Sequence, residues 1–356
     1  MIQVLLSIFL VTNANVEKLF EKASKWRVRE AISEVDSARK ELVKLGDVSL
    51  EYIFTKKIKT TSTLEYRAIR YVVKHLREKS RPFIYKGLHS DNDTIRINCI
   101  RLLGDLKDTM SLDTLIALLK SEKKKKVKRA IIAALGDIGV KRAATEIIPY
   151  LKDKDMRMRL VACVALGKLK NPESVGPLFD AMEDKSYLVR STALWALEKI
   201  GNEEVLEGAL KRLKKRFWEN YVGQAVNTAG AGLEILGNPD IVGIAAIEAG
   251  RASLPGLTQK KFDELMCWKR IKYIRLIGRV APSIYEKHPD DALVILARKR
   301  LIKLLDSPCY LARGYAVRAL SKFNDDRIKR LLESKSLTEV NLFVRSQYEE
   351  TLQKQN

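Results

Sequence analysis

The chain has 356 residues, of which 46% are hydrophobic, 7% are aromatic and 31% are charged. This apolar content excludes an intrinsically disordered chain, and the scarcity of alternating Val, Thr and Tyr patterns favours helices over strands. The formal net charge of +22 attracts anions, namely nucleic acid, anionic lipid, cell-wall polymer or an acidic protein. A lysine-rich surface that serves only solubility is the alternative.

The N-terminal residues, MIQVLLSIFLVTNA, contain an apolar run from Val4 to Val11. The run has the length of a signal-peptide core, and the small residue Ala14 follows at a plausible cleavage point. It is too short to span a bilayer. No Lys or Arg precedes it, so an apolar first helix that docks onto the next helix is the alternative. We expect a signal peptide over residues 1–14 and an exported or periplasmic protein, or a cytoplasmic protein if the segment is retained.

A repeat follows residues 15–62, which we expect to form N-terminal capping helices. Basic residues recur at intervals of 32, 31 and 31 near the start of similar apolar runs: Arg96, Lys128, Arg159 and Arg190. A fixed period in the low thirties is typical of a repeat array.

Each repeat is predicted to contain two helices. In the run before Gly201, the apolar residues Ala193, Leu197 and Ile200 fall at i, i+4 and i+7, which is the spacing of one helix face. A second apolar helix precedes it, and neither can bury its face alone, so successive hairpins should stack into one core. Asp153 and Asp184 lie shortly before second helices, where they can cap free N–H groups. The basic residue that follows can pair with a neighbouring Asp, which would form a ladder across the repeats.

The stretch VACVALGKLKNPESVGPLFDAMEDKSYLVRSTALWALEKIG resembles the HEAT-repeat family, particularly the HEAT-like repeats of bilin lyases. The similarity runs from about Asp91 to Ile200, and a weaker copy starts at Thr63. Two late copies contain Arg313 and Arg345, which are 32 residues apart. The resemblance implies a right-handed α-solenoid whose second helices line a concave face, and it implies binding far more often than catalysis.

We therefore predict an all-α fold, a right-handed α-solenoid of roughly eight to ten HEAT-like hairpins. Regular repeats are expected over residues 63–212 and atypical glycine-rich repeats over residues 213–290. The C-terminal repeats and a cap are expected over residues 291–356.

The sequence carries no recognisable catalytic motif. The three histidines, His75, His89 and His288, are not followed by Glu, whereas metal-binding HEAT enzymes such as deoxyhypusine hydroxylase carry repeated His-Glu pairs. HExxH, Walker and GxSxG motifs are also missing. The cysteines lie in apolar runs without a CxxC pair, which indicates buried free thiols: Cys99, Cys163, Cys267 and Cys309. We expect no catalytic residue, no cofactor and no metal.

Three basic clusters are candidate binding surfaces. The first is Lys123, Lys124, Lys125 and Lys126, where lysines replace the Asp that the family has before the second helix. Cations are unfavourable at a helix N-terminus, which suggests anion capture, although a solvated loop is the alternative. The second cluster places cations beside an aromatic residue, which suits nucleic-acid stacking or an exposed helix end: Lys211, Lys214, Lys215, Arg216 and Trp218.

The third cluster is a stripe along one predicted helix. Trp268, Lys272, Arg275 and Arg279 fall at i, i+4, i+7 and i+11, beside a buried isoleucine face. The stripe would present one aromatic ring and three cations if this helix lies on the concave face. The charged side of any amphipathic helix is the alternative.

These features predict a non-catalytic scaffold that holds an acidic protein or another anionic partner on a basic concave face. The alternative is a protein that grips nucleic acid without reading its sequence. Use like that of a DNA glycosylase would need a tryptophan-containing groove, to which Trp195, Trp218 and Trp268 could contribute. A subunit of a bilin-lyase-like enzyme is a third possibility, although no tetrapyrrole pocket is marked in the sequence.

Overall fold

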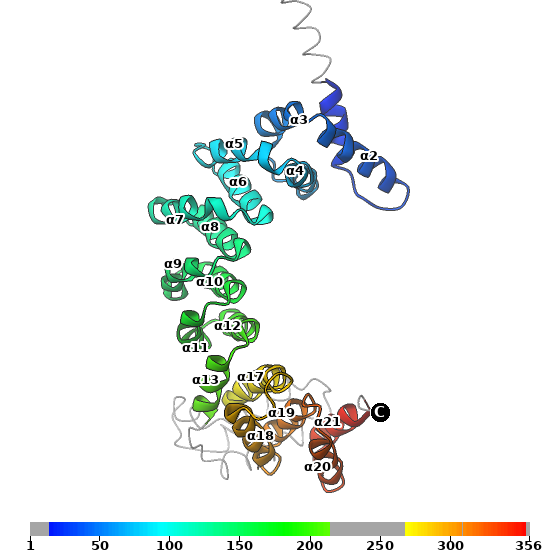
Figure 1. Cartoon of the computed structure of the whole chain (residues 1–356), viewed down its shortest axis with the longest axis vertical. Coiled ribbons are helices and arrows are strands. Elements are labelled where there is room, and N and C mark those ends of the chain that lie inside the picture. The colour runs from blue at the N-terminus through cyan, green and yellow to red at the C-terminus, as the bar shows by residue number, and fades with distance from the viewer. Residues whose placement is uncertain (1–13, 214–267, 308, 354–356) are drawn as a thin grey trace, which may run out of the picture. The chain divides into compact units, whose positions relative to one another are not determined.

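The computed structural model describes residues 14–213, 268–307 and 309–353 (Figure 1). These residues form helices joined by short turns, and no strand occurs among them, so the predicted all-α class is confirmed. The chain divides into two compact units, residues 1–174 with 185–192 and residues 175–184 with 193–356.

The first unit starts with a helix over residues 14–23. Two further helices and a π-helical turn complete its N-terminal part: α2 (Ala31–Lys44), α3 (Asp47–Tyr52) and η1 (Ile53–Lys57). The repeats follow as α4 (Thr63–His75), α5 (Arg77–Leu88), α6 (Asp93–Leu106), η2 (Thr109–Ser111), α7 (Leu112–Ser121), α8 (Lys125–Ile138), η3 (Lys141–Ala143), α9 (Ala144–Ile147), η4 (Ile148–Lys152), α10 (Met156–Leu169), η5 (Pro172–Ser174) and the start of α12 (Tyr187–Ile200). The second helices α6, α8 and α10 pack on one another in turn, and α7 and α9 lie beside them (Figure 1).

The sequence period is also a backbone period. The second helices α6, α8 and α10 end at Lys107, Gly139 and Lys170, which have φ angles of 50°, 82° and 50°. A left-handed residue at this position stops the helix and turns the chain into the 3-10 turn that precedes the next first helix. A side chain in this region has a steric cost, which glycine avoids at position 139.

Glycine also sets the distance between successive second helices. A Cβ atom built on Gly136 would lie 2.7 Å from Cα of Ala165, and one on Gly104 would lie 3.0 Å from Cα of Ala134. The absence of a side chain at these points lets the leucines and isoleucines around them close into a core. Leu135 and Leu166, for example, are fully buried, and each such side chain contributes roughly 2 kcal/mol relative to exposure.

The second unit continues the same packing with α11 (Val175–Ala181), the end of α12, α13 (Glu203–Leu213), α17 (Trp268–Tyr285), α18 (Ala292–Leu304), α19 (Tyr310–Leu320), α20 (Asp326–Ser336) and α21 (Leu342–Gln353). The second helix α17 packs on α13 and on α19, and α19 packs on α21. A Cβ atom on Gly278 of α17 would lie 2.4 Å from Cβ of Ala319 in α19, so the glycine–alanine contact of the first unit recurs here. The helices α13 and α17 are thus partners in one hairpin, although residues 214–267 separate them in the sequence.

The cysteines differ from their prediction at one position. Cys99 and Cys163 are buried free thiols. Cys309 is buried as well, but it is disulfide-bonded, so the prediction of a free thiol at this residue is wrong. Apolar neighbours predict burial, and burial does not distinguish a thiol from a disulfide. Cys267 lies outside the described residues.

Candidate functional site

The lysine run before α8 is partly neutralised by the preceding repeat. The carboxylate of Asp93 lies 2.8 Å from Nζ of Lys124 and 2.9 Å from Nζ of Lys126. Hydrogen bonds from these two lysines lower the pKa of Asp93 to about 2. Lys123 and Lys125 are exposed to solvent. Two of the four lysines therefore bind a carboxylate of the protein itself.

Glu122 holds the backbone of the turn just before α8, which has no side-chain cap of its own. Its Oε1 accepts hydrogen bonds from the backbone N–H groups of Lys123 and Lys124, both at 2.8 Å. Its other oxygen lies 3.3 Å from Nη2 of Arg96. A carboxylate at this end of α8 offsets the unfavourable meeting of lysines with the helix dipole.

Replacing Asp93 by Asn should make the stability of the first unit less sensitive to acid. A carboxylate with a lowered pKa stabilises the fold above its ordinary value near 3.8 and loses that effect as the pH falls through about 2. In urea unfolding, wild type should therefore have a higher free energy of unfolding than D93N at pH 7, and this difference should disappear near pH 2. Asp91, an exposed neighbour, provides the control variant Asp91→Asn. An equal gap at both pH values would contradict the assignment.

The arginine that recurs near the start of the second helices forms a hydrogen bond to the loop that precedes its helix. Arg96, Arg159 and Arg313 each donate to the carbonyl oxygen six residues earlier, at 2.9, 2.8 and 2.9 Å. Arg190 donates to the carbonyl of Lys185 at 3.1 Å. Lys128 occupies the same position but has a single amino group in place of the branched guanidinium. Its Nζ lies 5.8 Å from the ring centre of Tyr150.

The same repeat position is filled in α17 by Arg270. It precedes Gly278 by eight residues, as Arg96 precedes Gly104. Its Nη2 donates to the carbonyl of Leu213 at 2.9 Å, so it makes the loop-fixing bond across 57 residues rather than six. The period in the sequence did not reveal this arginine, because residues 214–267 separate α17 from the regular repeats.

Ion pairs also connect successive repeats. Four of them among the described residues join positions that are 26 apart: Arg96 with Glu122, Lys120 with Glu146, Arg129 with Asp155, and Arg313 with Glu339. Asp153 accepts from the backbone N–H of Asp155 at 2.7 Å, and Asp184 is half-buried in the equivalent loop. Arg345 is exposed on α21. These residues stabilise the array, and none forms part of the surface described below.

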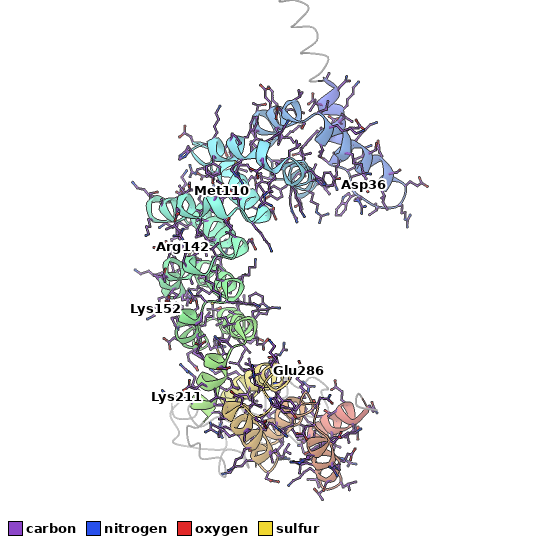
Figure 2. All side chains as sticks on the ribbon, in the orientation of Figure 1. Asp36, Met110, Arg142, Lys152, Lys211 and Glu286 are labelled. Carbon is purple, nitrogen blue, oxygen red and sulfur yellow. The ribbon has the colours of Figure 1, made fainter. Side chains whose placement is uncertain are left out.

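The second basic cluster is described only at its first residue. Lys211 is exposed on the first helix α13 (Figure 2). Lys214, Lys215, Arg216 and Trp218 lie outside the described residues, as does the side chain of Trp268. Trp195 is half-buried on α12, where Nζ of Lys199 lies 5.9 Å from its ring centre.

The stripe on α17 is divided by the structure. Lys272 turns toward the loop after α11, where it pairs with Glu183 and donates to the carbonyl of Met182. Tyr273 donates to the same glutamate at 2.9 Å. Arg275 and Arg279 instead remain exposed.

Two further cations join Arg275 and Arg279, namely Arg318 on α19 and Lys322 in the turn that follows this helix. We call these four residues the cationic surface. The ring of Tyr315 links the two helices, because the guanidinium of Arg275 lies 5.9 Å and that of Arg318 lies 5.8 Å from its centre. Burial lowers the pKa of Lys322, and the nearby charge of Arg279 adds to this shift because both effects disfavour the charged amine.

Two carboxylates partly balance this surface. Nη1 of Arg279 lies 3.1 Å from Oε2 of Glu198, whose side chain is only 14% exposed. Burial raises the pKa of Glu198, while Arg279, Arg275 and Lys322 oppose that effect. Arg318 lies 3.6 Å from Glu350 in an exposed pair. Within the part of the chain that the structure describes, no ion pair is found for Arg275 or Lys322.

The sequence prediction missed Tyr315, Arg318, Lys322 and Glu198. A comparison of equivalent positions in the second helices would have found the two cations. The residues two before the buried Leu or Ile are Arg101, Ala133, Val164, Trp195, Arg275 and Arg318, and those two after it are Asp105, Asp137, Lys168, Lys199, Arg279 and Lys322. Both of the compared positions are basic only in the last two helices of this comparison, with Arg275 and Arg279 and with Arg318 and Lys322.

Other features of the described residues also bear on where a site could lie. A pocket of about 280 Å³ in the second unit is lined by two ion pairs that neutralise each other, Arg313 with Glu339 and Lys335 with Asp306. Among the described residues, no three His, Cys, Asp or Glu side chains are placed to hold a metal ion. None of the helices in this part of the chain has the length and apolarity needed to cross a membrane.

Comparisons with known proteins agree with the helical hairpins. The sequence profile of HEAT repeats matches residues 81–156 and 144–227, and no curated protein sequence matches the chain. Importin beta is similar in structure, with 11% identity and a TM-score of 0.51 over 98% of this chain and 48% of its own, so this chain spans about half of importin beta. This likeness shows the fold alone.

Two further solved structures have lower scores. Human deoxyhypusine hydroxylase has 14% identity and a TM-score of 0.27 over 97% of this chain and 96% of its own. The CpcE–CpcF complex of phycocyanin lyase from Nostoc sp. has 18% identity and a TM-score of 0.32 over 68% of this chain and 93% of its own. The repeat match places HEAT repeats within residues 81–227, and the stacked hairpins of the described residues have the fold of a helical-repeat solenoid.

Proposed function

We propose that this protein is a non-catalytic scaffold that holds an acidic protein segment on the cationic surface. The observation that carries the proposal is the group of four cations on α17, on the adjacent α19 and in the turn after α19. Two of the four have no ion pair among the described residues. Arginine suits this role, since its planar guanidinium matches the two oxygens of a carboxylate. Uncompensated charges of one sign also speed the encounter with an oppositely charged partner.

We also propose that the protein is exported. The apolar run from Val4 to Val11 supports a signal peptide, and the disulfide at Cys309 fits an oxidising compartment. Nucleic acid is then a less suitable partner than a protein.

Nucleic acid remains the second candidate because of one feature. Tyr315 lies between two guanidinium groups, and an aromatic ring beside cations can stack a base while the cations bind phosphates. An acidic peptide needs the cations but not the ring. The two candidates therefore differ in which ligand binds and in the effect of removing the ring.

The test compares a fluorescein-labelled decaglutamate peptide with a labelled 20-nucleotide single-stranded DNA, by fluorescence anisotropy at low salt. Charge reversal at Arg275 and Arg318, in the variant R275E/R318E, should weaken decaglutamate binding by at least roughly tenfold. The matched control is K299E/K303E, which makes the same change of charge on the exposed side of α18. Equal losses in both variants would show an effect of net charge alone and reject the surface. Tighter binding of the DNA, lost in Tyr315→Ala, would favour the second candidate.

A further inference from the structure

Glu198, which pairs with Arg279 of the cationic surface, departs from the glycine found at its position in other repeats. The position after the buried Leu or Ile is glycine in four second helices, namely Gly104, Gly136, Gly167 and Gly278, but it is Glu198 in α12. Three of these glycines face an alanine of the next second helix at a distance that leaves no room for a Cβ atom. The α12 helix therefore carries a long charged side chain where the packing of the array favours none.

The Glu198 side chain reaches from α12 to the next second helix. Its Oε2 lies 3.1 Å from Nη1 of Arg279, and Arg275 and Lys322 act on the same carboxylate. The guanidinium of Arg279 is half-exposed, whereas Glu198 is largely buried. One face of Arg279 is thus held by a carboxylate of the protein, and solvent has access to the rest.

The carboxylate of Glu198 reduces the repulsion among the four cations of the cationic surface. Without it, the ion pair of Arg318 with Glu350 at 3.6 Å would be the one left to these four cations among the described residues. Burial lowers the pKa of Lys322, and the charges of Arg279, Arg275 and Arg318 lower it further, whereas Glu198 opposes the shift. An arriving carboxylate would relieve the same repulsion that Glu198 now relieves.

We propose that Glu198 is a resident carboxylate that occupies one anion position of the cationic surface, and that an acidic partner segment binds by placing its own carboxylate on Arg279 in exchange. This inference rests on the proposed function and names the ligand group, a carboxylate. Because Glu198 competes for Arg279, a single acidic side chain gains little by the exchange. Only a segment whose further carboxylates reach Arg275, Arg318 and Lys322 binds well, so the surface selects clustered acidic residues.

The test is Glu198→Gln, measured with the labelled decaglutamate peptide at low salt. The amide keeps the shape of the side chain and removes the competing charge, so affinity should rise roughly three- to tenfold. The matched control is Glu183→Gln, which removes one charge from the pair with Lys272 outside the cationic surface. Its affinity should stay within about twofold of wild type. Glu198→Gly, the residue of the other repeats, is a second variant should the glutamine protein unfold.

The outcomes separate the two proposals. Unchanged or weaker binding in E198Q, together with loss of binding in R275E/R318E, would overturn the exchange and leave the scaffold function in place. Glu198 would then be a positioning residue for Arg279. No binding of decaglutamate to either wild type or E198Q would reject both. Tighter binding of the single-stranded DNA alone would overturn the carboxylate as the ligand group.

Discussion

Replacing Gly278 by Val should lower the free energy of unfolding of the second unit by about 3 kcal/mol. The first new atom would lie 2.4 Å from Cβ and 2.7 Å from Cα of Ala319, and the second of these is backbone that cannot swing aside. The helices α17 and α19 would have to separate, which would expose the core between them. Urea unfolding followed by circular dichroism measures the loss.

The control for this substitution is Gly176→Ala in α11. A Cβ atom there meets nothing within 4 Å, and the residue is exposed. Alanine loses less backbone entropy on folding, so this variant should gain up to about 1 kcal/mol. A Gly278→Val protein as stable as wild type would mean that α17 and α19 do not approach closely, and the position of Arg275 beside Tyr315 would then be in doubt.

Replacing Arg313 by Ala should cost about 3 kcal/mol. The guanidinium makes two hydrogen bonds to Glu339, at 2.8 and 3.0 Å, and a third to the carbonyl of Ser307. Its removal leaves the Glu339 carboxylate unpaired, with only 9% of that side chain exposed. A buried charge without a partner is among the most destabilising changes in a protein. Thermal and urea unfolding of R313A measure the effect.

The stability of the wild-type protein should depend on pH through Glu339. Burial alone would raise the pKa of Glu339, but the hydrogen bonds from Arg313 and from the backbone outweigh it, and the pKa is lowered. The stabilisation is therefore complete above the ordinary pKa of a glutamate and is lost as the pH falls through the lowered value. In R313A this loss on acidification should disappear. The double variant R313M/E339L should recover most of the stability, since paired apolar groups replace a buried ion pair with little penalty. Failure to recover would mean that the pocket around these residues, rather than the pair, carries the effect.

The regular repeats could be predicted because their signals are local. Arg96, Lys128, Arg159 and Arg190 each stand three residues after the start of a second helix in the structure. The apolar spacing and the polar loop that define such a helix lie within about 15 residues of each other. No long-range information is needed to find them.

The cationic surface could be predicted only in part. Arg275 and Arg279 share one helix, so the spacing along the sequence placed them on one face. Arg318 comes from α19 and Lys322 from the turn after it, and Glu198 comes from α12, which precedes residues 214–267 in the sequence. Their meeting depends on which helices are neighbours, and periodicity within one helix does not contain that information. The prediction for Lys272 shows the same limit, because its partner Glu183 lies 89 residues away.

The bond between Arg270 and Leu213 has a consequence for how the chain folds. In the regular repeats the equivalent bond closes a loop of six residues, whereas here it joins residues that are 57 apart. The larger loop costs about 2 kcal/mol more chain entropy to close. Arrays of local contacts fold quickly, and each non-local contact slows the search. We therefore expect α17 to dock first on its sequence neighbours α18 and α19, and the hairpin with α13 to form last. The slowest step in refolding of the second unit is then the docking of α17 on α13.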